Sequence, residues 1–249
     1  SAASDVYKRQ DQYDGDSRNP DVTFGDSLEG DLIRRDFRVN AMALELRPDG
    51  DHQFQDPLGG LDDAAAGLLD TPDSPEISFN DDPLRMLRAC RFVSQLEFAV
   101  APRVGAAMKE MAPQIKRITV ERVAVELNKL MLGAAPWDGL DLMVDSGLAE
   151  FVLPELPALK MTQDEHKQHK DVYRHSLRVL RNAVELEAKN NWEPDLELRM
   201  ASLLHDVGKP ATRAFTESGA VTFHQHEVVG AKMTLSLIHI SEPTRQEAI

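Results

Sequence analysis

Residues 80–92 read Asn-Asp-Asp-Pro-Leu-Arg-Met-Leu-Arg-Ala-Cys-Arg-Phe, and the rest of the chain is organised around this stretch. It predicts the start of a helix, because side-chain caps precede Pro83 and proline suits the first helical position. At 100° per residue, one side of this helix carries a charged stripe of Asp81, Arg85 and Arg88, flanked by Asp82 and Arg91. The opposite side is apolar and is predicted to be buried, with Met86, Leu87, Cys90 and Val93.

A row of guanidinium groups behind N-terminal carboxylates has two interpretations. Arginine is a planar donor of several hydrogen bonds that suits phosphate, and an aspartate beside it could match the edge of a base. The alternative is a capped helix with an Asp81–Arg85 ion pair on a solvated face. Three arginines at three-residue spacing, with no lysine among them, favour the binding interpretation.

The segment Asp31–Leu46 begins with helical periodicity and ends in the alternation of a strand. One side is predicted to be buried, and it carries Leu32, Phe37, Ala41 and Leu44. On another side Arg35 and Asp36 could bind a phosphate or a ribose, with a surface ion pair as the alternative. Asp49-Gly50-Asp51 then predicts a hairpin turn, and residues 52–57 a strand that pairs back across it.

Both stretches resemble the nucleotide-binding motifs of class II bacterial CCA tRNA nucleotidyltransferases and poly(A) polymerases. The motifs are Arg-Asp-Phe-x-x-Asn-Ala at residues 35–41 and Asp-Asp-x-x-Arg-x-x-Arg-x-x-Arg-Phe at residues 81–92. The resemblance implies nucleotide contacts at Arg35, Asp36, Asn40, Asp82, Arg85, Arg88 and Arg91. Asp82 and Arg85 are expected to read the base edge, and the other arginines to hold phosphate, ribose or the helix itself.

Histidines gather in the last third of the chain. His175 lies in one periodic segment, residues 173–188, and His205-Asp206 ends another, residues 195–206. The link of residues 190–194 is short, which predicts antiparallel helices with the three side chains close together. Imidazole and carboxylate suit a divalent transition metal. Lys209 could hold a phosphate, and the pocket could be completed by His224 and His226.

This pattern resembles the HD phosphohydrolase domain. A lone histidine is more often a satisfied buried side chain, but an adjacent His-Asp with a partner histidine thirty residues upstream weakens that interpretation. The HD domain also ends with a distant aspartate, and no candidate for it precedes residue 235. The resemblance therefore implies an incomplete metal site at His175, His205 and Asp206, with weak binding.

Composition limits the classes of function. The chain has 249 residues and a formal net charge of −14, which argues against a generally basic nucleic-acid binder, although residues 82–129 carry nine Lys or Arg against five acids. The single cysteine, Cys90, permits no internal disulfide and suits a reducing cytoplasm. No apolar run reaches membrane-spanning length, and no signal peptide is visible.

Both ends look foreign to the fold. Residues 1–10 and 235–249 resemble translated sequencing adapters, so residues 11–234 are interpreted as the native part, a fragment. The Asp-x-Asp pair that holds the catalytic metals in the family is expected upstream. Asp14-Gly15-Asp16 imitates it but has the composition of a turn, and no residue of the chain is therefore assigned as catalytic.

The expected fold class is α+β and mostly helical. Residues 11–73 would form part of a nucleotidyltransferase head with a partial sheet, residues 74–158 a helical neck that binds RNA, and residues 159–234 the start of an all-α HD domain. Helices are predicted at 83–96, 102–111, 119–132 and 135–147. Domain boundaries are expected at residues 71–78 and 153–159, where prolines gather.

The resemblance implies addition or repair of the CCA end of tRNA from CTP and ATP, with Mg²⁺, by a chain that is inactive as truncated. Addition of A alone and poly(A) polymerisation share these motifs and stay open. The alternatives are an HD-domain metal phosphohydrolase with a helical nucleic-acid-binding module, and a helical RNA-binding protein without enzymatic activity.

Overall fold

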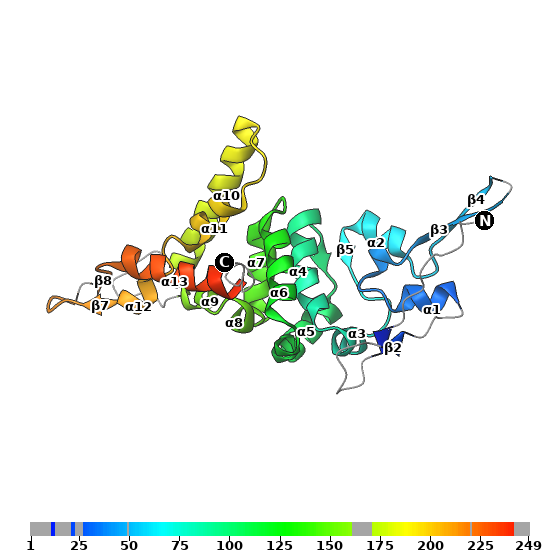
Figure 1. Cartoon of the computed structure of the whole chain (residues 1–249), viewed down its shortest axis with the longest axis horizontal. Helices are drawn as coiled ribbons and strands as arrows, with labels where there is room; N and C mark the ends of the chain where they lie inside the picture. Colours follow the sequence, from blue (N-terminus) through cyan, green and yellow to red (C-terminus); the bar gives the residue numbers. More distant parts are fainter. Residues whose placement is uncertain are drawn as a thin grey trace, which may run out of the picture. The chain divides into compact units, whose positions relative to one another are not determined.

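The computed structural model describes residues 11–12, 21–22, 27–48, 50–160, 171–219 and 221–241. The chain divides into two compact units, and Figure 1 labels most of their helices and strands. Unit 1 consists of Ser1–Arg85 and Phe98–Ala107, and unit 2 of Met86–Glu97 and Met108–Ile249. Among the described residues, no helix is both long and apolar enough to cross a membrane.

Unit 1 combines short helices with short paired strands. Its elements are β1 (Asp11–Gln12), β2 (Asp21–Val22), α1 (Leu28–Ile33), the 3₁₀ helix η1 (Arg38–Asn40), β3 (Ala43–Leu46), β4 (His52–Gln55), α2 (Gly60–Ala66), β5 (Leu68–Leu69), α3 (Pro75–Asp81) and β6 (Ala99–Val100). The strands pair in twos: β1 with β2 and β3 with β4 are antiparallel, and β5 with β6 is parallel. The hairpin of β3 and β4 confirms the turn predicted at residues 49–51, of which residue 49 lies outside the described residues.

The buried side predicted for residues 31–46 is confirmed in three of its four members. Leu32, Phe37 and Ala41 are buried, but the prediction for Leu44 is wrong, because its side chain is 56% exposed. The reason is the sheet around it: β3 pairs only with β4 among the described strands, and Leu44 lies opposite Phe54, which is also exposed. Alternation in a sequence identifies two faces of a strand but does not say that anything covers one of them.

The loop before α2 is built around one carboxylate. Gly59 has a left-handed φ of 75°, a conformation that glycine adopts without steric cost. Asp56 then accepts hydrogen bonds from the backbone N–H groups of Gly60, at 2.7 Å, and Leu61, at 2.8 Å. These groups would otherwise have no partner within the helix. A Cβ on Gly60 would lie 2.1 Å from the carbonyl oxygen of Arg38, so α2 begins directly against η1.

Asp56→Ala is expected to lower the free energy of unfolding by about 1 kcal/mol, the usual cost of losing a helix cap. Urea titration followed by circular dichroism measures it. Asp56→Asn keeps only one of the two acceptor oxygens, because Gly60 and Leu61 bond different oxygens of Asp56, and it should retain about half of that stability. An alanine variant as stable as the parent would show that water caps α2 equally well.

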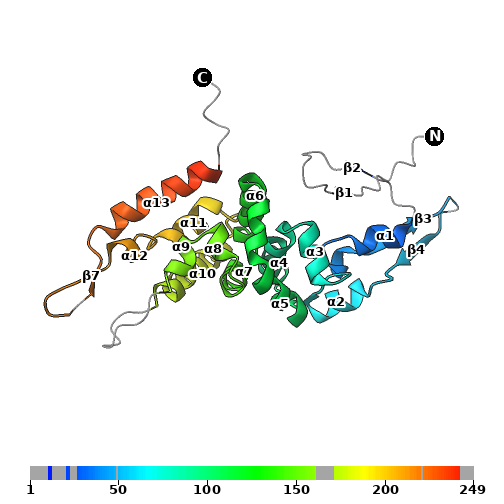
Figure 2. The same cartoon turned by 90° about the horizontal axis from the view of Figure 1, so that it is seen from below.

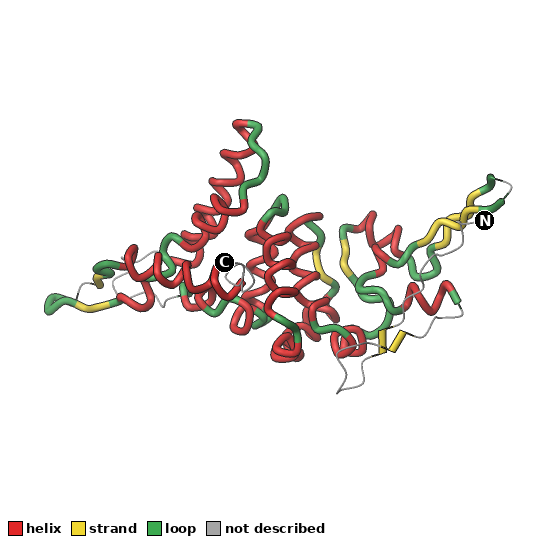
Figure 3. Tube along the Cα trace, viewed as in Figure 1, coloured by secondary structure: helices red, strands yellow, loops and turns green. Residues whose placement is uncertain are grey.

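Unit 2 is almost entirely helical, as the red tube of Figure 3 shows. Its elements, of which the first two begin in unit 1, are α4 (Leu84–Leu96), α5 (Pro102–Met111), η2 (Ala112–Arg117), α6 (Val120–Met131), α7 (Pro136–Asp145), α8 (Ala149–Val152), α9 (Glu155–Ala158), α10 (Val172–Asn190), α11 (Leu196–Leu204), α12 (Lys209–Thr212), β7 (Ala214–Phe215), β8 (Val221–Thr222) and α13 (His226–Ser241). The strands β7 and β8 form an antiparallel pair. The helices predicted at 83–96, 102–111, 119–132 and 135–147 are found within two residues at each end.

Two local expectations are wrong. Asp81 is the last residue of α3, a helix that begins behind the capping side chain of Ser74, so Asp81 does not share a helix with Arg85. The charged stripe of α4 therefore begins at Arg85. The neck of residues 74–158, expected to be helical, also contains β6, which is too short to show alternation.

The predicted packing of α10 against α11 is confirmed. The two helices lie side by side in Figures 1 and 2, and five residues connect them. Asn191 ends α10 in the left-handed conformation, where its backbone N–H bonds the carbonyl of Ala188. The cap side chain of Asp195 then starts α11 by accepting from the N–H groups of Glu197 and Leu198.

Candidate functional site

Inside unit 1, Arg85 of the second nucleotide motif contacts Arg34, the residue directly before the first motif. The Arg85 guanidinium donates through Nη2 to the carbonyl oxygen of Arg34 at 2.6 Å, a contact between residues 51 positions apart. Its Nη1 donates to Oγ of Ser78 at 2.8 Å. Asp82 stands just before α4 and accepts from the N–H of Leu84 at 3.2 Å. Arg85 thus joins the end of α1 to α3 with its side chain in a fixed position.

The first motif forms a compact loop between α1 and η1. Asp36 is buried, and its Oδ1 accepts from the N–H of Phe37 at 2.9 Å and from Nδ2 of Asn40 at 3.2 Å. Arg35 is different, because its side chain is 48% exposed and pairs with Asp31 at 3.1 Å. Asp36 and Asn40 therefore shape the backbone, while Arg35 presents a cation to solvent beside them.

A buried carboxylate that the sequence analysis missed supports this loop. Asp70 Oδ2 lies 2.9 Å from Nη2 of Arg38, and Asp70 Oδ1 lies 2.7 Å from Nε of Arg103. Arg103 also donates to the carbonyl of Thr71 at 2.7 Å. Because the partners of Asp70 lie more than thirty residues away on either side, no local spacing in the sequence indicates this cluster.

The last two arginines of α4 lie in unit 2. Nη1 of Arg91 lies 2.8 Å from Oε2 of Glu126 on α6, and both side chains are 9% exposed. Arg91 also stacks over Phe92. Of the roles that the sequence left open for this residue, the geometry favours holding the helix over contact with a ligand. Arg88 lies one turn earlier on α4 and is half-buried.

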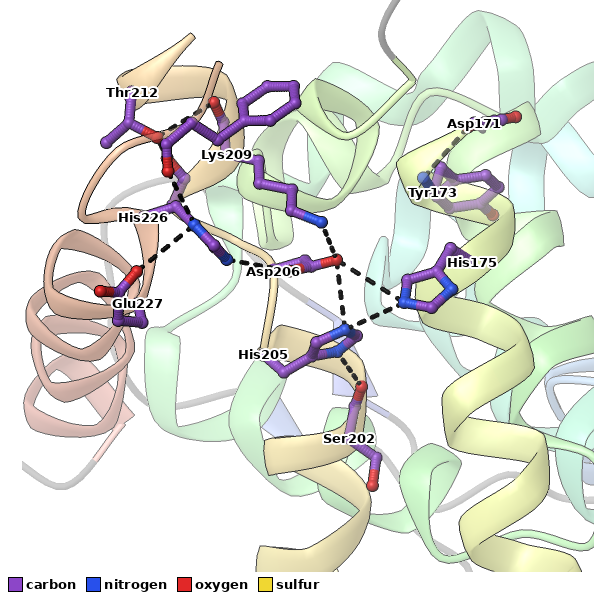
Figure 4. Close-up of polar contacts among 12 residues, drawn as sticks. Asp171, Tyr173, His175, Ser202, His205, Asp206, Lys209, Thr212, His226 and Glu227 are labelled. Atoms are coloured by element: carbon purple, nitrogen blue, oxygen red, sulfur yellow. Dashed lines mark hydrogen bonds and ion pairs between the residues drawn. The ribbon is translucent and has the colours of Figure 1, made fainter. Parts of the chain in front are cut away.

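In unit 2 the predicted metal ligands converge, as Figure 4 shows. His175 comes from the first turn of α10, His205 caps the end of α11, and Asp206 follows it. Nε2 of His205 lies 3.3 Å from Nε2 of His175 and 3.2 Å from Oδ2 of Asp206. Potential ligand atoms of these three residues lie within 4.8 Å of one another, and no other such group of three exists among the described residues.

The surroundings orient this cluster for a cation. Nδ1 of His205 lies 2.9 Å from the carbonyl of Ser202, and if it donates there, Nε2 carries the lone pair that faces the cluster. Asp206 is only 3% exposed, so its carboxylate needs compensating charge. Two imidazoles and one carboxylate are a donor set that suits a divalent transition metal, and the residues therefore fit the group that the sequence predicted.

The predicted pocket residues separate into two kinds. Lys209 Nζ lies 2.7 Å from Asp206 Oδ2, and His226 Nε2 lies 3.6 Å from Asp206 Oδ1. His226 is oriented like His205, since its Nδ1 lies 2.8 Å from the carbonyl of Phe223. His224 is exposed, and the interactions of the described residues do not join it to the cluster.

Glycine brings His226 to Asp206. A Cβ on Gly208 would lie 2.2 Å from the carbonyl of His226 and 2.6 Å from the nitrogen of Gly230, both backbone atoms that cannot move aside easily. The residue after Val207 must therefore be glycine for α13 to begin this close to α12. The sequence analysis missed this close approach.

The start of α10 is anchored on α7. The hydroxyl of Tyr173 donates to Oδ1 of Asp141 at 2.6 Å, and Arg174 bonds the other oxygen at 2.8 Å. Burial, together with the bond to Asp141, raises the pKa of Tyr173 well above its usual range, so the phenol stays a donor. This anchor fixes the helical turn that carries His175.

Three family descriptions match successive parts of the chain. "Poly A polymerase head domain" matches residues 6–70, "Probable RNA and SrmB- binding site of polymerase A" matches residues 97–159, and "HD domain" matches residues 172–248. The first and last matches extend into the end segments 1–10 and 235–249 that the sequence analysis set aside, and α13 continues to Ser241.

Relatives of known function agree with these matches. The A-adding tRNA nucleotidyltransferase of Deinococcus radiodurans is 35% identical over 230 residues, which are 90% of this chain and 51% of that protein. A tRNA nucleotidyltransferase crystallised with a primer tRNA and an incoming ATP analogue is 26% identical with a TM-score of 0.57, over 74% of this chain and 50% of that one. The Bacillus stearothermophilus CCA-adding enzyme in complex with CTP is 26% identical with a TM-score of 0.52, over 86% and 61%. The chain spans about half the length of the first of these relatives.

Proposed function

This chain belongs to the bacterial CCA-adding enzyme and poly(A) polymerase family and carries an HD domain, and from that membership we propose that the protein transfers nucleotides from CTP and ATP to the 3′ end of tRNA. The observation that carries the proposal is the contact of Arg85 with the carbonyl of Arg34, which brings the second nucleotide motif against the start of the first within unit 1. We place this activity in the cytoplasm, where tRNA and both nucleotides are found.

The roles of the motif residues follow from their contacts. Arg35 is exposed and pairs with Asp31 at the surface, and it is proposed to bind the triphosphate, while Asp36 and Asn40 keep the loop beside it in shape. Asp82 and Arg85 are proposed to face the base. The bonds of Arg85 to Ser78 and Arg34 support that role, because a base-reading group must be held in position by its neighbours.

The metal of nucleotidyl transfer is proposed to be Mg²⁺, bound by carboxylates. The metal-ligand group found among the described residues contains two imidazoles, which suit a transition metal better than Mg²⁺. No described residue is therefore assigned to that Mg²⁺, and Asp14 and Asp16 lie outside the described residues.

Arg35→Ala is expected to weaken binding of ATP and CTP to the chain about tenfold, which is the usual worth of one charge-assisted hydrogen bond. Fluorescence anisotropy with labelled nucleotides measures it. Arg47→Ala is a matched control, because Arg47 is a similarly exposed arginine of unit 1 that lies on the β3–β4 hairpin. If both variants bind as the parent does, Arg35 is not a nucleotide ligand, and a chain that binds neither nucleotide would contradict the proposed function itself.

A second candidate function is favoured by the cluster in unit 2. We propose that His175, His205 and Asp206 hold a divalent transition metal and that the HD domain hydrolyses phosphoesters. When bound, such a metal supplies a Lewis acid and lowers the pKa of a bound water. The chain itself orients the two imidazoles and shields the carboxylate of Asp206 from water. Measurements of metal binding by His205 variants test this candidate function.

A further inference from the structure

We propose that Lys209 is an exchangeable cation, which neutralises Asp206 while the metal position is empty and moves to a phosphate group of the ligand when a metal binds. This inference rests on the proposed metal role of His175, His205 and Asp206 and concerns how that site is regulated. Its substrate class is a phosphate ester or free phosphate bound next to the metal.

The first step of the argument is the buried carboxylate. Asp206 has only 5% of its side chain exposed, and an isolated carboxylate in such a position is strongly disfavoured. Lys209 compensates it with an ammonium group 2.7 Å from Oδ2. The lysine starts the four-residue helix α12, three positions after Asp206, so backbone geometry brings the two side chains together.

The second step is competition for one oxygen atom. Oδ2 of Asp206 lies 3.2 Å from Nε2 of His205 and 3.7 Å from Nε2 of His175, so a metal bound to both imidazoles would use this same oxygen. Metal ligands of these types sit at about 2.0–2.2 Å. A dication at that distance and an ammonium group on the same oxygen repel each other strongly in a partly buried site. Lys209 and the metal therefore compensate the same charge and compete.

The third step is where the released lysine goes. Its stem is flexible and its side chain is 23% exposed, so the ammonium group can swing away from Asp206 without unfolding α12. It lies 5.8 Å from the centre of the Phe223 ring, on the side of the site where His226 begins α13. Lysine is a common point-charge ligand of phosphate, and a phosphate on the metal would place its negative charge within reach. Metal and phosphate should therefore strengthen each other's binding through Lys209.

Lys209→Met is expected to tighten metal binding about 5- to 150-fold, the usual range of coupling between two ligands that share a site. The folded chain is titrated with Zn²⁺ or Co²⁺ against a chelating indicator, in buffer without phosphate. Lys189→Met is the matched control, because it removes an exposed lysine on α10 and should leave the affinity unchanged. Lys209→Gln provides a second variant if the methionine variant folds poorly.

The second arm adds inorganic phosphate. In the parent chain phosphate should raise the apparent metal affinity, and in Lys209→Met this increase should shrink at least severalfold. A methionine variant that binds metal no more tightly than the parent would overturn the exchange. If neither Lys209→Met nor His205→Ala changes the metal affinity, the proposed metal site itself is wrong. Tighter metal binding by Lys209→Met together with a smaller effect of phosphate would support the whole inference.

Discussion

Replacing Arg199 with methionine is expected to lower the free energy of unfolding of the chain by about 3–5 kcal/mol, because it leaves a buried carboxylate without its partner. Arg199 and Glu187 are both 3% exposed, and Nη2 of the arginine lies 2.6 Å from Oε2 of the glutamate. Nη1 donates to the carbonyls of Met131 and Gly133, each at 2.8 Å. One side chain thus joins α10 and α11 to the end of α6.

The measurement is urea or thermal unfolding of the two single variants and the double variant. Glu187→Leu with Arg199→Met removes both charges, and it should be more stable than the sum of the single effects predicts. It should not recover fully, since the carbonyls at the end of α6 lose their donor. Arg181→Met is the control, because Arg181 is exposed on α10, where it pairs with Glu185 and lies over the Trp137 ring, and its loss should cost only about 1 kcal/mol. Equal effects at Arg199 and Arg181 would contradict the argument.

This ion pair also shows why part of the fold escapes prediction from sequence. Arg199 lies in an amphipathic helix that the periodicity predicts correctly. A charged residue in such a helix is normally predicted to face solvent, so the sequence does not indicate that Arg199 is buried. Its burial depends on a glutamate and two carbonyls supplied by other elements. The same holds for Arg91 with Glu126 and for Asp70 with its two arginines.

Local signals explain what the sequence could predict. The range of α5 follows from apolar spacing and agrees with the structure at both ends, residues 102 and 111. In contrast, β6 pairs with β5 over two residues only, and a strand of that length has no detectable alternation. The prediction that Leu44 is buried was wrong for a related reason. Whether one face of a strand is buried depends on what packs against it, and the sequence pattern of the strand does not show that.

The candidate metal site could be predicted because its three residues lie on or directly after two consecutive helices joined by a short turn. His205 and Asp206 are neighbours, and the short turn between α10 and α11 sets the position of His175. The contribution of His226 was less visible, since it depends on the close approach of Gly208 to α13. His224, two residues earlier and chemically identical, does not join the cluster, and no sequence pattern separates the two.

His205→Ala is expected to weaken binding of a divalent transition metal at least about 100-fold. Loss of a residue that only orients a metal ligand costs about 10–100-fold, and His205 supplies a ligand atom itself. Its Nε2 lies 3.3 Å from Nε2 of His175 and 3.2 Å from Oδ2 of Asp206, so its removal leaves one imidazole and one carboxylate to hold the metal. His224→Ala is the matched control, because it removes an exposed imidazole of the same domain and should not change the affinity.

Thermal unfolding in the presence of metal provides a measurement that does not depend on activity. A ligand at about 100 times its Kd stabilises a folded protein by about 2.7 kcal/mol, and at about its Kd by only about 0.4 kcal/mol. At a metal concentration chosen for the first condition in the parent chain, His205→Ala should therefore lose most of the metal-induced shift in Tm. If His205→Ala keeps that shift in Tm while His224→Ala loses it, the metal is bound elsewhere. The cluster of His175, His205 and Asp206 then stabilises the fold and does not bind metal.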